Sequence, residues 1–435
     1  MTRLPARGLA AYAALALPLA AVQLPVYIHG PKLYAELGLG LAAIGGLLLA
    51  LRALDALSDP LLGYLSDRTS SARGGRRLWI ALAAPLIALG VVLLFNPPAL
   101  GPGPLAAWLA ASVVCVHLGL SAASVSYTAW GAELSHDRHE RTRVTAARGA
   151  AGLVGVLLAA ALPEWLGATL GRGAGLAWFA LAAVPVVAAG TLVTLYGTPA
   201  AASRPAAAGS WARSVALPFA NRDFRWLAAV FVVNGTAAAL PATLVLFYVE
   251  DVLRAPQLAG AFLAIYFLCG ALAMPLWVRL AAALGKRRAW LAGMAASAGA
   301  FVWAYALGPG DAAAFAAVCA LSGLAFGADL ALPASLLADV ADRDERAGGR
   351  PDGAYFGIWH LLEKLVLALA AGIGLPLIAV LGYAPGTGQG AGALAFAYAL
   401  VPCAIKLAAA ALLALSPLES RARIPGVQPE GVTSC

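Results

Sequence analysis

Twelve apolar stretches, each about 20 to 28 residues long, divide this chain from end to end. A helix needs about 20 apolar residues to cross a bilayer, whereas a barrel strand needs only about 9–11. Only 11% of the residues are charged, against roughly 25% in soluble proteins. We therefore predict an all-α integral membrane protein whose spans are 8–29, 40–66, 77–96, 105–132, 147–169, 174–196, 224–249, 258–283, 288–307, 312–340, 354–381 and 391–416.

Positive charges alternate between the predicted loops. Of the 29 Lys and Arg residues, 22 lie in or at the edges of the N-terminus, every second loop and the C-terminal tail, whereas the opposite loops hold Lys32, Arg172 and Arg254. Because Lys and Arg favour the cytoplasmic side, we predict a multi-pass protein of the cell (inner) membrane with both termini in the cytoplasm. The net charge of +8 then reflects topology, so we expect membrane lipid and no nucleic acid as a partner.

The two halves of the chain repeat one another. Asp137–Arg141 follows the fourth span and Asp342–Arg346 follows the tenth, and both contain the pattern DRxER. An internal repeat of six spans is typical of two-bundle secondary transporters. We predict a six-helix bundle at 1–196, a cytoplasmic linker at 197–223, a second bundle at 224–416 and a cytoplasmic tail at 417–435.

Asp55 and Asp59 lie four residues apart inside the second span, so both leave one face of a helix. A carboxylate at the bilayer centre costs roughly 2.5–3.5 kcal/mol, so two on one face indicate a function. Arg52 shares that face, which leaves a local charge of about −1. Ser58 adds a hydroxyl, and hard cations such as Na⁺ take oxygen ligands. The pattern predicts a site for Na⁺ or H⁺; the alternative is that the pair only extends to the cytoplasmic interface.

Another charged residue lies deep in a span of the second half. Lys364 is about ten residues into the eleventh span, too deep to reach water easily, so it needs an acidic partner. The adjacent Glu363 points about 100° away along a helix, which leaves Asp329 on the tenth span. We predict an Asp329–Lys364 contact, either a fixed structural pair or one that breaks during transport.

Other polar and aromatic side chains fall on shared helix faces within the spans. They suit a solute cavity between the two bundles, and packing between helices is the alternative for each. The candidates are Gln23 and Tyr27 on the first span, His117, Ser121 and Ser124 on the fourth, and Tyr355, Trp359 and His360 on the eleventh.

The loop after the second span carries Gly63, Asp67 and Arg68, followed by Arg76 and Arg77. It resembles the GxxxDRxGRR loop of the major facilitator superfamily, with an insertion before its second half. That resemblance implies a latch between the two bundles at the cytoplasmic face. The alternative is an ordinary basic loop.

Three widely separated motifs sharpen the resemblance. Arg52–Gly63 is similar to the second-helix signature of the glycoside–pentoside–hexuronide:cation symporters, a family of that superfamily. Tyr127 with Glu133–Arg141 resembles the family's fourth-helix motif, and Leu332–Val340 and Gly353–Gly357 resemble its tenth and eleventh helices. Together these motifs cover nearly the whole chain and imply the twelve-helix fold in two pseudo-symmetric bundles.

The resemblance also assigns residues. It implies cation ligation by Asp55, Asp59 and Ser58, with Ser121 where the family supplies a further hydroxyl. It adds Tyr127 and Arg148 to the residues around the solute cavity. Ser124 stands where a galactoside carrier of the family has a sugar-binding Asp, so galactoside specificity is not implied.

We predict cation-coupled symport of a small polar solute, a sugar or glycoside, by alternating access in a monomer. No cofactor is expected beyond the coupling ion, and no P-loop or catalytic motif indicates an enzyme. Two alternatives remain: transport of a lipid-like or other amphipathic solute, or a membrane-embedded sensor or enzyme.

Overall fold

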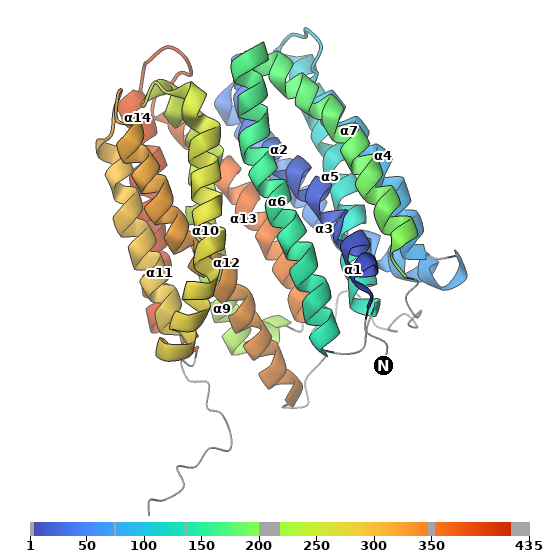
Figure 1. Cartoon of the computed structure of the whole chain (residues 1–435). Helices are drawn as coiled ribbons and strands as arrows, with labels where there is room; N and C mark the ends of the chain where they lie inside the picture. The colour runs from blue at the N-terminus through green and yellow to red at the C-terminus, as the bar shows by residue number, and fades with distance from the viewer. Residues whose placement is uncertain (1–3, 74, 135–137, 200–217, 347–352, 419–435) are drawn as a thin grey trace, which may run out of the picture.

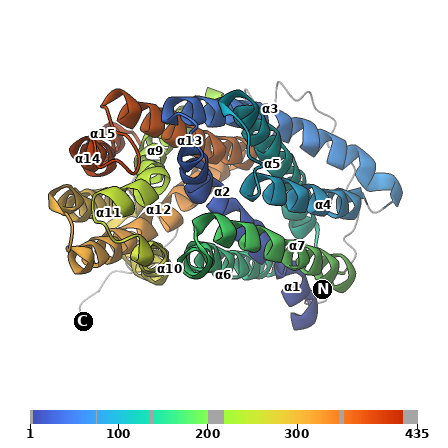
Figure 2. The same ribbon diagram turned by 90° about the horizontal axis from the view of Figure 1, so that it is seen from above.

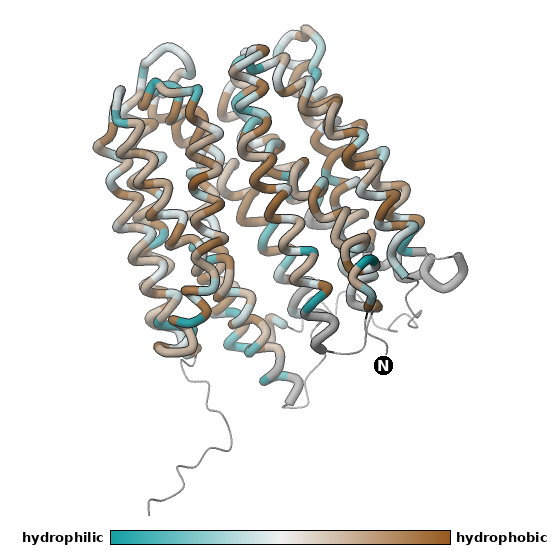
Figure 3. The backbone as a smooth tube through the Cα atoms, in the orientation of Figure 1, coloured by the Kyte–Doolittle hydropathy of each residue, from teal (hydrophilic) through white to brown (hydrophobic). Residues whose placement is uncertain are grey.

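The computed structural model describes residues 4–73, 75–134, 138–199, 218–346 and 353–418 (Figure 1). Within these ranges the elements are helical and no strand occurs. Hydrophobic residues run along the helices (Figure 3), and a backbone in hydrocarbon must satisfy its own hydrogen bonds, so each apolar stretch forms a helix. Eleven of the described helical segments are long and apolar enough to cross a membrane. The other long helix, α3 (Leu41–Arg73), carries Arg52 and Asp55.

Among the described residues, six helical stretches make up each half, in agreement with the predicted all-α fold of the membrane-spanning protein. Several helices run past their predicted ends; the first continues to Glu36 rather than 29. The N-terminal half contains α1 (Ala6–Ala13) and α2 (Ala16–Glu36), α3, α4 (Gly75–Phe95), α5 (Pro102–Glu133), α6 (Arg138–Leu170) and α7 (Arg172–Gly197). The C-terminal half contains α9 (Arg222–Asp251), α10 (Ala259–Leu284), α11 (Lys286–Phe301) with η3 (Val302–Ala306), α12 (Ala312–Arg346), α13 (Gly353–Val380), α14 (Ala391–Ala395), η4 (Phe396–Leu400) and α15 (Val401–Leu415).

The two halves lie side by side and meet along two seams (Figure 2). In one seam, α3 packs on α13, where a Cβ on Gly45 would come within 2.8 Å of the Ala371 carbonyl oxygen. In the other, α10 packs on α6, where a Cβ on Gly260 would come within 2.8 Å of Glu164 Cβ. Small residues allow such close approach between membrane helices. These seams position the side chains of α3 and α13 opposite one another.

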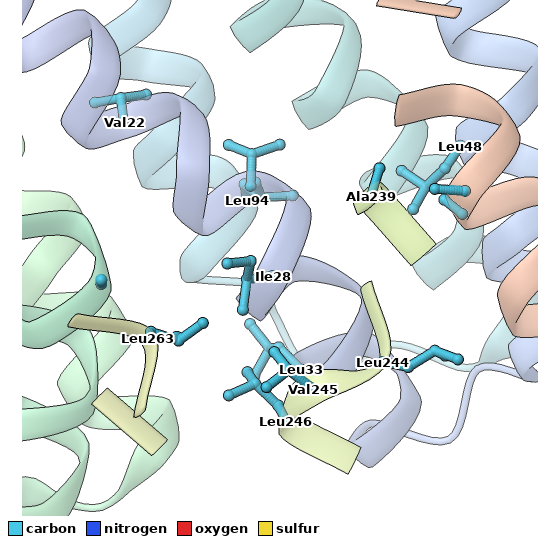
Figure 4. Close-up of a cluster of buried hydrophobic side chains, with 14 of the residues drawn as sticks. Val22, Ile28, Leu33, Leu48, Leu94, Ala239, Leu244, Val245, Leu246 and Leu263 are labelled. Atoms are coloured by element: carbon cyan, nitrogen blue, oxygen red, sulfur yellow. The ribbon is translucent and has the colours of Figure 1, made fainter. Parts of the chain in front are cut away.

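An even number of spans places the start of α1 and the end of α15 on one side of the molecule, which we call the terminal side; the other is the distal side. One large apolar core joins both halves toward the distal side, where Ile28 and Leu33 of α2 lie near Val245 and Leu246 of α9 (Figure 4). A second core, around Trp290, contains described residues of the C-terminal half alone. The halves are therefore packed together toward the distal side.

A group of charged residues reinforces that contact. We call Lys32, Glu36, Arg172 and Glu250 the distal cluster. Arg172 Nη2 lies 2.7 Å from Glu250 Oε2, and Arg172 Nη1 lies 3.3 Å from Glu36 Oε1. Lys32, only 1% exposed, places Nζ 3.3 Å from Glu250 Oε2 and 4.6 Å from the centre of the Phe247 ring. Because Glu250 and Phe247 belong to the C-terminal half, these contacts tie the two halves together.

Candidate functional site

Asp55 lies at the centre of a buried polar group between the two halves. Its side chain is only 2% exposed. Arg52, one turn earlier on the same helix, donates from Nη1 to Asp55 Oδ2 over 3.0 Å. Ser121 of α5 donates its hydroxyl to Asp55 Oδ1 over 2.8 Å. A buried carboxylate must be paired in this way, because an uncompensated charge in the interior is costly.

The third partner of Asp55 comes from the opposite half. Lys364 of α13 places Nζ 3.1 Å from Asp55 Oδ2 and donates to Ser121 Oγ over 2.6 Å. The predicted Asp329–Lys364 contact is therefore wrong, although the prediction that Lys364 needs an acidic partner is confirmed. The reason is helix rotation: α13 turns Lys364 toward α3 and α5, while Asp329 of α12 faces the interior of its own half.

Aromatic side chains border this group. Tyr27 of α2 lies beneath Arg52, with the guanidinium carbon 4.3 Å from the ring centre, a cation–π arrangement. The His117 ring lies 6.0 Å from the Tyr27 ring, and His117 is buried. The Tyr27 hydroxyl is enclosed and has no hydrogen-bond partner among the described residues. Gln23, one turn earlier on α2, is exposed.

The structure describes part of the predicted cation site and of the predicted latch. The side chains of Ser58 and Asp59 lie outside the described residues, as do those of Asp67 and Arg68 and the surroundings of Gly63 in the predicted latch. Asp55 and Ser121 are the predicted cation ligands that the structure does describe, and it brings them together.

Of the predicted latch, Arg77 has a clear position. It donates from Nη2 to the Thr198 carbonyl oxygen over 2.9 Å and lies over Trp130, both in the N-terminal half. Arg76, beside it, is half-buried and has a partner as well. Contact of this loop with the other half stays a prediction.

Several predicted cavity residues pack within one half. Tyr127 stacks on Tyr12 with ring centres 4.5 Å apart and donates its hydroxyl to the Tyr12 carbonyl oxygen. Arg148 donates to the Thr128 hydroxyl over 2.7 Å. Whether Tyr127 and Arg148 contact a solute in another state stays a prediction.

Two predicted aromatic residues of α13 are also buried. Trp359 is 4% exposed and lies against Phe231 with ring centres 4.0 Å apart. Tyr355 is 2% exposed, and its hydroxyl accepts a hydrogen bond from the Asn221 side chain. In this structure both contribute to the core of the C-terminal half and neither offers a free ring face.

His360 and Ser124 have a different environment. His360 is exposed and places Nδ1 2.9 Å from Glu363 Oε2. It lies one turn from Lys364 on α13 and therefore shares the face that points toward the N-terminal half. Ser124 of α5 is also exposed. Both suit the edge of a space between the halves.

Asp329 belongs to a separate buried group. Its Oδ1 accepts hydrogen bonds from Asn234 Nδ2 over 2.9 Å and from Trp290 Nε1 over 2.8 Å. Its Oδ2 lies 2.8 Å from Lys406 Nζ. Lys406 and Trp290 were not among the predicted site residues. The depth of Lys406 inside the last span was a signal that it needs a partner.

Comparison with known proteins agrees with this architecture. Residues 9–420 match the protein family described as MFS/sugar transport protein. The chain belongs to this family. Its fold is that of the major facilitator superfamily, as predicted, and a member of this family is a membrane transporter rather than an enzyme.

Individual relatives are distant. The inner membrane symporter YicJ of Escherichia coli is 26% identical over 250 residues, which cover 55% of this chain and about half (54%) of YicJ. The uncharacterized symporter sll1374 of Synechocystis is 23% identical, over 76% of this chain and 77% of the relative. A bacterial homologue of the lysosomal transporter Spinster, solved in an inward-facing and unoccupied conformation, has a TM-score of 0.65 at 15% identity, over 95% of this chain and 96% of that one. These similarities support secondary transport by this family member.

The distal cluster was absent from the predicted sites. Lys32 and Arg172 were already conspicuous, because they are two of the three positive residues on the side predicted to carry few. Because Lys and Arg are otherwise rare in the loops on that side, these two residues were a signal of a specific role. Which acids they contact depends on how the two halves meet.

Proposed function

We propose that this family member is a cation-coupled symporter of a small polar solute, a sugar or glycoside. The observation that supports this most is the Asp55 group: one carboxylate is held by residues of both halves, including the Lys364 ammonium 3.1 Å away. An ammonium in that position is a fixed positive charge that a mobile Na⁺ or H⁺ would replace. Binding of the cation at Asp55, with Asp59, Ser58 and Ser121 as further ligands, would release Lys364.

Release of Lys364 provides a route from ion binding to movement. The Lys364 contacts join α13 to α3 and α5, so their loss would remove a link between the halves. The unpartnered Tyr27 hydroxyl and the exposed Gln23, Ser124 and His360 would then contact solute oxygens. Cation and solute would favour each other's binding, as linkage requires of a symporter.

The proposed orientation follows from the charge distribution. With both termini in the cytoplasm, the distal side faces outward, and its packed core and distal cluster correspond to a closed outer side. We therefore assign the structure to an inward-facing conformation in the inner membrane.

Uptake into vesicles tests the proposal. The purified protein is reconstituted in proteoliposomes, and a labelled sugar is added outside them. Uptake is measured under an inward Na⁺ gradient, under an inward proton gradient, and without either gradient. We expect one gradient to accelerate uptake, and Asp55→Asn to reduce that stimulation on the order of a hundredfold, since couplings of 1–3 kcal/mol correspond to roughly 5–150-fold.

Matched variants and solutes complete the assay. Ser112→Ala is the control variant and should keep ion-stimulated uptake. It removes a buried hydroxyl of α5 that donates to the Trp108 carbonyl oxygen of the same helix. Flux that ignores both ions argues against symport. Ion-driven uptake of an amphipathic solute in place of every sugar tried would favour the alternative solute class.

A further inference from the structure

The C-terminal half contains a cavity that is separate from the Asp55 group. It lies in the distal half of the bundle, among α9, α10, α11, α12, η4 and α15, and includes roughly 710 Å³ of empty space when its open mouth is counted. Aromatic rings from three of these segments form much of its wall. They are Phe262, Tyr266 and Phe267 of α10, Phe301 of α11 and Tyr398 of η4.

One buried cation lines this otherwise apolar cavity. Lys406 is 5% exposed and is a lining residue. Among the described residues its ammonium donates to Asp329 alone, over 2.8 Å, so two of its three N–H donors have no protein acceptor there. A buried donor without an acceptor costs free energy that a ligand oxygen would recover.

The surrounding charges restrict what such a ligand can be. Asp329 neutralises Lys406, and Asn234 and Trp290 donate to the same carboxylate. A cationic head would be repelled by Lys406, and an anionic head would leave one uncompensated negative charge in an apolar wall. An uncharged hydroxyl, ester or ether oxygen satisfies the free donors without either cost.

We propose that this cavity binds an uncharged amphiphile, whose apolar chain packs on the aromatic rings and whose oxygen-bearing head accepts hydrogen bonds from Lys406. The cavity is spatially separate from the Asp55 group, because Lys364 pairs with Asp55 of the other half and Lys406 pairs with Asp329 of its own. Its ligand comes either from the bilayer, as a resident neutral lipid, or from the solutes that the protein carries.

Photolabelling of the full-length protein in nanodiscs tests the site. The probe is a 1-monoacylglycerol with a diazirine in its acyl chain, and labelled peptides are identified by mass spectrometry. Ser297→Phe fills the cavity from α11, whereas Ala296→Phe adds the same ring at the neighbouring exposed position. We expect labelling of the peptide that contains Tyr398 and Cys403 to decrease about tenfold or more in Ser297→Phe, a change of one decade or more in affinity.

The matched variant should label as the unchanged protein does. Equal labelling of the Tyr398–Cys403 peptide in Ser297→Phe and Ala296→Phe would overturn the proposal. Labelling confined to residues on the outer surface of the helix bundle, away from the cavity, would overturn it as well. Thermal unfolding of both variants confirms that the comparison is between folded proteins.

Two further arms test the head group and the source of the ligand. The double variant Asp329→Asn with Lys406→Met preserves neutrality and removes the donors, so it should lose the preference for the monoacylglycerol over an alkane probe of equal length; an unchanged preference would overturn the role of Lys406. In sealed vesicles, probe that accumulates in the lumen identifies a carried solute, and probe that stays protein-bound identifies a resident lipid.

Discussion

Gly45 of α3 lies so close to α13 that a single methyl group should disturb the contact between the halves. A Cβ at this position would lie 2.7 Å from Pro376 Cδ, 2.8 Å from the Ala371 carbonyl oxygen and 3.2 Å from Leu375 Cβ. The first distance is about 0.7 Å short of the 3.4 Å at which ordinary van der Waals contact begins, and two of the three neighbours are backbone or ring atoms that cannot rotate away.

Gly45→Ala should therefore destabilise the conformation in which the distal side is closed. Overpacking a tight contact costs about 1–3 kcal/mol. If the open conformation does not have this contact, the equilibrium shifts by roughly 5–150-fold toward it. Gly46→Ala is the matched control, because a Cβ there meets nothing within 4 Å and both variants gain the same helix propensity.

A cysteine at Leu33 can report the shift. Leu33 is 6% exposed and lies beside Val245 and Leu246 across the contact between α2 and α9 (Figure 4). In a background without the native cysteines, we expect a membrane-impermeant maleimide to react faster with Leu33→Cys when Gly45→Ala is present. Equal labelling rates for Gly45→Ala and Gly46→Ala would show that the close contact at Gly45 does not hold the distal side closed.

Three other substitutions follow from the buried charges. Glu250→Gln removes the negative charge that pairs with Arg172 and with the buried Lys32, so we expect at least a fivefold rise in the same labelling rate, from about 1 kcal/mol or more. No rise would show that the distal cluster does not hold the halves together. Lys364→Met should tighten Na⁺ or H⁺ binding at Asp55, measured by calorimetry, while uptake loses its ion dependence; weaker ion binding would contradict the displacement mechanism. Asp329→Leu leaves Lys406 buried without its acidic partner and should lower the free energy of unfolding by about 3–5 kcal/mol. The unfolding temperature should fall, and a second substitution, Lys406→Met, should restore it. Equal unfolding temperatures for the single and double variants would contradict this prediction.

The fold was largely accessible from the amino-acid pattern. Twelve apolar stretches of helical length, an alternating distribution of Arg and Lys, and the repeated DRxER string predict a two-bundle transporter, and residues 9–420 match a family of such transporters. The apolar stretches are local features: they depend on the residue types in about 20 consecutive positions and on the cost of exposing peptide groups to hydrocarbon. The charge alternation and the repeat are read along the whole chain. Helix ends were less accurate, because a helix can continue into the interface after its apolar residues stop.

The candidate site was accessible in part. Asp55 could be singled out because a carboxylate at that depth needs compensation, and Ser121 was assigned through the family resemblance. The depth of Lys364 also predicts that it has an acidic partner. These inferences use the position of a residue along its own helix.

The pairing of the buried charges depends on the tertiary structure. Lys364 and Lys406 both lie deep in the C-terminal half, and Asp55 and Asp329 are both buried acids, yet the pairs are Lys364 with Asp55 and Lys406 with Asp329. Helical periodicity assigns residues to faces of one helix but does not say how that helix is rotated against its neighbours. Rotation is settled by packing across the seams and by closure of the distal side. The chain order therefore predicts which residues need partners, and the assembled bundle determines which partner each one meets.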